Sequence, residues 1–88
     1  GTVLTKLAKN GEVTFVNAAT GLVSSIPFIK GLNLRMAINS AKMDPRYKVF
    51  EIVRPSGIIK VGWKQLSSLG NAKLNSSDVI RVIEIASN

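Results

Sequence analysis

Residues 33–45 read NLRMAINSAKMDP, and they are the one segment of this 88-residue chain with clear helical periodicity. Apolar side chains recur there at the spacing that places them along one side of a helix. These residues are Leu34, Ala37, Ile38 and Ala41. Asn33 precedes them and can cap the first turn through its side-chain oxygen, whereas Pro45 disfavours helix at residue 44 and sets the end. The segment predicts one short amphipathic helix.

Segments typical of β-strands lie on both sides of this helix. Before it, residues 2–9 and 12–16 flank Asn10-Gly11, a pair that favours a type I′ hairpin turn, and residues 22–28 follow. After it, residues 47–54 and 58–64 flank the turn Pro55-Ser56-Gly57, and residues 78–85 close the chain. A single helix among hairpins must bury its apolar side against a sheet. We therefore predict one α+β domain over residues 1–88.

The order of these segments predicts a β-grasp-like architecture. We expect an antiparallel or mixed sheet of four to five strands packed on one helix, with an N-terminal β-hairpin. Because side chains alternate across a strand, each strand has a helix-facing side and an outer side. The predicted helix-facing core is Phe50, Ile52, Ile59, Val61, Ile80 and Val82.

The outer side of these strands is unusually apolar. It carries Val49, Val53, Ile58, Val79, Ile83 and Ile85, interleaved with Glu51, Lys60 and Arg81. Two interpretations remain open: the N-terminal hairpin covers this face, or a neighbouring domain or subunit docks on it. The three charged side chains are placed to pair across strands.

The residue types present exclude most catalytic chemistry. The chain has no histidine and no cysteine, so it has no His-activated nucleophile, no thiolate metal site and no disulfide. Asp44 and Asp78 lie at element boundaries, where capping or turn formation is their expected role. We predict a non-enzymatic protein with no cofactor and no metal site. No apolar run is long enough for a membrane-spanning helix.

The net charge of +7 favours anionic partners or simply solubility. The basic residues are scattered, and Lys42, Arg46 and Lys48 form the best local cluster. Trp63, between Lys60 and Lys64, is either a core-edge residue or an aromatic that stacks on a sugar or base. Tyr47 is interpreted as a structural edge aromatic. The candidate binding residues are Lys60, Trp63, Lys64, Arg81 and Ile83.

Several short motifs resemble the soluble-ligand-binding β-grasp (SLBB) domains of bacterial polysaccharide export proteins. The matching pieces are Ile26-Pro27, the helix of residues 34–41, Ile52-Val53-Arg54-Pro55, Gly57, and Leu74 with Asp78-Val79-Ile80-Arg81-Val82. The chain departs from the family at four glycine positions. Phe28 follows Pro27, Lys42 and Met43 follow Ala41, and Ser77 precedes Asp78.

The resemblance implies a periplasmic or cell-envelope module that binds and assembles in capsule or exopolysaccharide export, although a cytoplasmic location is not excluded. Its implied partners are neighbouring domains or subunits and an acidic polysaccharide. Two alternatives stay open. One is a basic nucleic-acid-binding module, disfavoured because the chain has few aromatic residues. The other is a structural interaction domain of a larger secretion or virion assembly.

Overall fold

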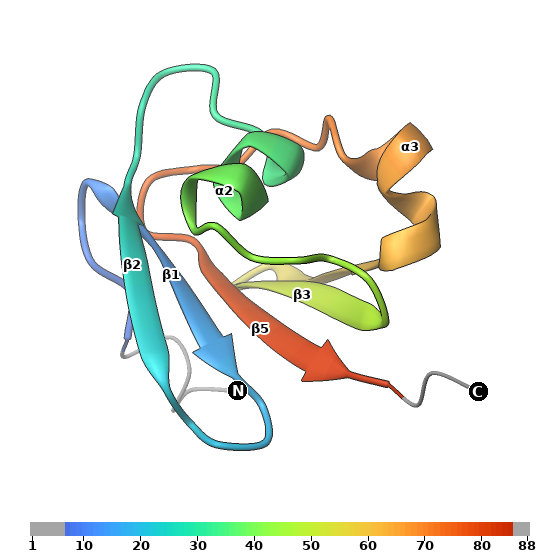
Figure 1. Ribbon diagram of the computed structural model, residues 1–88. Coiled ribbons are helices and arrows are strands. Elements are labelled where there is room, and N and C mark those ends of the chain that lie inside the picture. The colour runs from blue at the N-terminus through green and yellow to red at the C-terminus, as the bar shows by residue number, and fades with distance from the viewer. Residues whose placement is uncertain (1–6, 86–88) are drawn as a thin grey trace.

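The structure, a computed structural model that describes residues 7–85, has the predicted α+β composition (Figure 1). Its five strands are β1 (Glu12–Asn17), β2 (Val23–Pro27), β3 (Lys48–Arg54), β4 (Gly57–Gly62) and β5 (Val79–Glu84). Its helices are α2 (Leu34–Ser40), the 3₁₀ helix η1 (Trp63–Gln65) and α3 (Leu66–Leu69). The sequence predicted a single helix, so η1 and α3 are additions to the expected fold.

All five strands belong to one mixed sheet with the order β2-β1-β5-β3-β4. β1 and β5 lie side by side and parallel in the centre, whereas the other pairs are antiparallel. The two antiparallel hairpins, β1–β2 and β3–β4, therefore lie on opposite sides of β5. Figure 1 shows α2 over one face of this sheet. The opposite face is called the outer face below.

α2 begins at the predicted N-cap, but a backbone hydrogen-bond motif, and not Pro45, sets its C-terminal end. Asn33 Oδ1 accepts a hydrogen bond from Met36 N at 2.9 Å, as an N-cap does. At the other end Lys42 adopts a left-handed φ of 54°. The Lys42 and Met43 amides then donate to the carbonyls of Asn39 and Ile38, the two bonds of a Schellman motif. The helix therefore ends before Pro45 can act on it.

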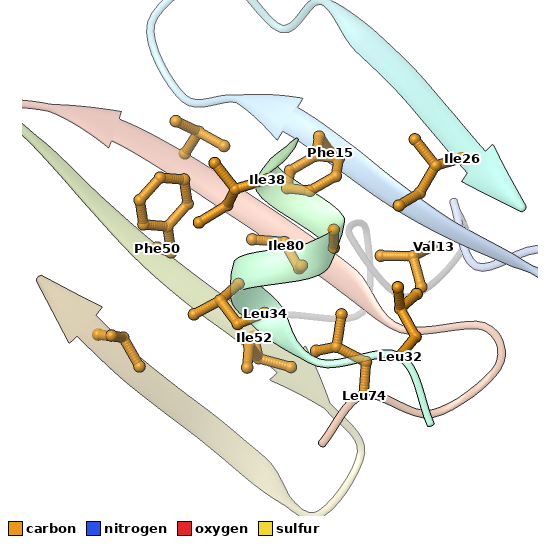
Figure 2. Close-up of a cluster of buried hydrophobic side chains, with 13 residues drawn as sticks. Val13, Phe15, Ile26, Leu32, Leu34, Ile38, Phe50, Ile52, Leu74 and Ile80 are labelled. Atoms are coloured by element: carbon orange, nitrogen blue, oxygen red, sulfur yellow. The ribbon is translucent and has the colours of Figure 1, made fainter. Parts of the chain in front are cut away.

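The core lies between α2 and the sheet, where apolar side chains from every strand converge (Figure 2). Phe50, Ile52, Val61, Ile80 and Val82 are buried there, as predicted. Ile59 was wrongly predicted as core, because its side chain is 42% exposed. It lies opposite Ile52, but on edge strand β4 and beside the β3–β4 turn, so it has a strand neighbour on one side only.

The predicted N-terminal strand, residues 2–9, falls partly outside the described residues. Residues 7–9 are not in a strand, so this part of the prediction is wrong. A turn does form at Asn10-Gly11, where Glu12 N donates to Lys9 O at 3.1 Å. Only Gly11 has a positive φ there, so the turn is not type I′. β1 pairs instead with β2 and β5.

Candidate functional site

The outer face carries an ion-pair cluster that crosses three strands. Glu51 on β3 lies opposite Lys60 on β4 and Arg81 on β5. Its carboxylate is 2.9 Å from Arg81 Nη1 and 3.5 Å from Lys60 Nζ, so the expected pairing across strands is confirmed. Because Glu51 is nearly buried and both cations are engaged with it, Lys60 and Arg81 are less available to a ligand than their sequence positions suggest.

The next row of the outer face is apolar and contains a gap. Ile83 on β5 lies opposite Val49 on β3, and Val49 lies opposite Gly62 on β4. Ile83 and Val49 are half-buried. Gly62 has no side chain, so the surface is hollowed at this position, and the hollow continues to the end of the sheet.

Trp63 and Lys64 leave the sheet, which corrects the prediction that the β4 strand runs through residue 64. β4 ends at Gly62, whose amide donates to Gln65 Oε1 at 2.8 Å and so starts η1. Strand alternation therefore no longer applies to Trp63, and its side chain is half-buried outside the core cluster. Its ring instead lies beside Tyr47, with centroids 5.0 Å apart and planes inclined at 56°.

Tyr47 is the residue that sequence reasoning missed. It was interpreted as a structural edge aromatic, but its side chain is 42% exposed. Its φ of 59° lies in the left-handed region, which bulky residues rarely adopt. The register of the β3–β4 hairpin is the feature that could have placed Tyr47 near Trp63. Val49 opposite Gly62 extrapolates to Tyr47 opposite Lys64, beside Trp63.

Together these residues line an open groove of about 390 Å³ at the end of the outer face. Its lining residues are Tyr47, Val49, Gly62, Trp63, Lys64, Gln65 and Ile85. Lys64 Nζ lies 5.4 Å from the centroid of the Trp63 ring, which is within cation–π range. The groove therefore combines two aromatic rings, an apolar floor and one cation, and it is called the aromatic groove below.

Of the five candidate residues, the structure brings Trp63 and Lys64 together in the aromatic groove. Ile83 adjoins the groove through Val49, and Lys60 and Arg81 lie one row further along the same face. All five are therefore on one continuous part of the outer face and its end, but only two of them line the groove.

The local cluster Lys42, Arg46 and Lys48 is largely neutralised. Arg46 pairs with Asp44 at 3.1 Å, and Lys48 Nζ lies 3.9 Å from Glu84. The hydrogen bonds from Arg46 lower the pKa of the Asp44 carboxyl below its ordinary value. Asp44 also accepts from the Arg46 amide, which is the turn-forming role expected of it. This cluster does not form a strongly basic surface.

Arg54 and Asp78 form the most buried ion pair that the structure describes. Arg54 Nη2 and Nε lie 2.8 and 3.0 Å from the two carboxylate oxygens. This hydrogen bonding raises the pKa of Arg54. Asp78 Oδ2 also accepts from Asn75 N at 2.7 Å and so closes the turn before β5. Its boundary role is therefore confirmed, with an ion pair in addition.

Within residues 7–85, no group of three or more acidic residues lies close enough together to hold a metal ion. None of the helices described is long and apolar enough to cross a membrane. A second depression, of about 450 Å³, lies on the α2 side between Phe15, Leu22 and Met43, and contains none of the candidate residues.

The comparisons with known proteins identify no relative: no protein-family model matches the sequence, and no curated protein matches it significantly.

Proposed function

We propose that this chain is a non-enzymatic binding and assembly module of the β-grasp type, similar to the SLBB domains of bacterial polysaccharide export proteins. The observation that carries the proposal is the backbone conformation of Lys42 and Ser77. Both residues have positive φ, 54° and 76° respectively. They stand where the family has glycine, after the helix and before the closing aspartate.

The positive φ at these two family glycine positions supports the resemblance, because it is a property of the backbone and does not depend on which side chain is present. A left-handed φ costs a non-glycine residue about 1–2 kcal/mol, so only a few positions in a fold require it. Three non-glycine residues among those described have positive φ, and two of them occupy family glycine positions. At these two positions the backbone thus has the left-handed conformation that glycine favours. Phe28 and Met43, at the other two glycine positions, do not have positive φ.

The strand order and the closing motif give further support. A β-grasp has a helix between two hairpins and a last strand parallel to the first, as β5 is to β1. Leu74, Ile80 and Val82 of the closing motif are buried in the core. The two polar residues of the family pattern, Arg54 and Asp78, pair with each other.

The charge distribution supports an acidic polysaccharide as the ligand. Four of the five acidic residues form ion pairs within the fold. The excess positive charge therefore comes from the remaining lysines and arginines, which are scattered along the sequence. Such a surface suits a flexible polyanion with one carboxylate per sugar better than the dense phosphates of duplex DNA.

The assembly part of the proposal is supported by β4. This edge strand exposes Ile58 and Ile59, which are 57% and 42% exposed. An edge strand with apolar side chains offers free backbone groups for pairing with a strand of another subunit. In a periplasmic or envelope assembly, this edge would join the module to its neighbour.

A binding experiment tests the proposal. The protein is titrated by calorimetry with polygalacturonate, with neutral dextran and with duplex DNA, each at low and high salt. We expect binding to polygalacturonate, weakened by salt, and no binding to dextran. Salt-sensitive binding to DNA without binding to any polyuronate would refute the proposal and favour a nucleic-acid-binding module.

A further inference from the structure

We infer that the aromatic groove binds a single uronate sugar ring, with the ring against Tyr47 and Trp63 and its carboxylate on Lys64. This inference rests on the proposed function, because it names the site at which an acidic polysaccharide would bind. The first argument is the exposure of the aromatic groups. Tyr47 and Trp63 both line the groove and lie outside the buried core cluster. Tyr and Trp combine a large apolar ring with a polar group, which is why both are enriched at binding surfaces.

The second argument is that the backbone that carries the two rings is held in place. Tyr47 O accepts a hydrogen bond from Ile85 N at 2.9 Å, which ties the residue to the end of β5. Trp63 is held by η1, which begins at the hydrogen bond between Gly62 and Gln65. Strained backbone that the surrounding structure holds in place, as at Tyr47, is concentrated at functional sites. The backbone around the groove is therefore ordered before binding, which lowers the ordering cost of binding.

The third argument is the pair of polar side chains that line the groove. Lys64 is exposed and carries the ammonium group nearest the rings. It is long enough to move from the Trp63 ring to a ligand carboxylate. Gln65 uses its Oε1 for the Gly62 amide, so its NH₂ group remains a donor for a sugar hydroxyl. Two aromatic rings, one cation and one amide donor match the apolar face, carboxylate and hydroxyls of a uronate.

The charges around the groove favour a uronate over a nucleotide strand. Arg46 and Lys48 lie near Tyr47 but are paired with Asp44 and Glu84, which line the adjoining depression. A nucleic acid strand places a phosphate at every nucleotide, and because Arg46 and Lys48 are already paired, neither offers its full charge to the phosphates beside the groove. A uronate ring needs only the one cation that Lys64 supplies.

The experiment uses Trp63 as its reporter, because it is the one tryptophan of the chain. Tryptophan fluorescence is followed while oligogalacturonate, a neutral galactose oligomer or a single-stranded oligonucleotide is added. We expect a saturable change with oligogalacturonate only. Lys64→Gln should weaken the affinity about tenfold, because a charge-assisted hydrogen bond is lost. Tyr47→Phe should bind like the parent, and Tyr47→Ala should bind much more weakly.

Lys30→Gln is the matched control, since it removes the same charge from an exposed loop after β2. That loop lies beyond the Glu12–Pro27 end of the sheet, whereas the groove lies at the Val49–Gly62 end.

Calorimetric binding of oligogalacturonate with unchanged fluorescence, and equal affinities for Lys64→Gln and Lys30→Gln, would overturn the site but leave the proposed function standing. No polyuronate binding at all would overturn the proposed function. A response to the oligonucleotide alone would overturn both. If Tyr47→Ala does not fold, Lys64→Gln decides.

Discussion

Arg54 and Asp78, 24 residues apart in the chain, are joined by a two-pronged ion pair that links the end of β3 to the start of β5. Asp78 is 4% exposed, and Arg54 Nη2 also donates to Lys73 O at 3.0 Å. The pair therefore fixes the loop before β5 against the β3–β4 hairpin. Because β5 is the central strand, this link positions both halves of the sheet relative to each other.

Removing the cation of this pair should be costly. Arg54→Gln leaves the Asp78 carboxylate buried without its partner, and we expect a loss of about 3 kcal/mol in the free energy of unfolding. Denaturant unfolding measures it. The control is Arg46→Gln, which breaks the fully exposed pair with Asp44 and should cause no resolvable change. Equal losses in the two variants would contradict the structural role of Arg54.

The sequence predicts the strands well where burial alternates along them. Glu12–Asn17, Lys48–Arg54 and Val79–Glu84 were found to within a few residues, because β-branched and aromatic residues are dense there and turn residues bound them. The order of the strands in the sheet could not be predicted from this local pattern. The parallel pairing of β1 with β5 joins segments more than sixty residues apart, and no local pattern records such a contact.

The alternation of apolar and polar residues along a strand also does not predict how deeply each side chain is buried. Ile52 and Ile59 lie opposite each other on β3 and β4, yet Ile52 is fully buried and Ile59 is not. We expect Ile52→Ala to cost about 3 kcal/mol and Ile59→Ala to cost under about 1 kcal/mol. Thermal and denaturant unfolding of the two variants compare them directly. A similar loss for both would mean that a covering element buries Ile59.

The candidate site was predicted only in part, and the reason is the end of β4. The residues after Val61 carry no sequence pattern that predicts a 3₁₀ helix. The strand was therefore extended through Trp63, and alternation assigned its side chain to the core face. The lysines beside Trp63 pointed to the correct region. Tyr47 could be placed near it only through the hairpin register, which depends on the exact length of the Pro55–Gly57 turn.

Gly70 should tolerate no larger side chain. A β-carbon there would collide with the Leu66 carbonyl and lie 3.0 Å from the Arg35 guanidinium. Arg35 itself bonds to Leu66 O and, through its amide, to Gly70 O, so it ties α2 to α3. We expect Gly70→Ala to lower the free energy of unfolding by about 2 kcal/mol. Gly62→Ala meets only the side-chain oxygen of Gln65, at 3.3 Å, and is the control, with a smaller loss.

The left-handed residues Lys42 and Ser77 allow a prediction in the opposite direction. Glycine adopts positive φ without the clash that an L side chain meets, which relieves about 1–2 kcal/mol at each position. The greater freedom of glycine in the unfolded chain offsets about 0.4–1 kcal/mol of this gain. Lys42→Gly and Ser77→Gly should therefore each raise the free energy of unfolding, by up to about 1.6 kcal/mol.

Alanine variants at the same two positions separate backbone strain from lost side-chain contacts. Lys42→Ala and Ser77→Ala remove the side chains but keep the β-carbon, so they should be no more stable than the parent. The four variants are compared by denaturant unfolding under identical conditions. If each glycine variant proves less stable than its alanine counterpart, the left-handed conformation at that position is wrong, and the argument from family glycine positions loses its basis.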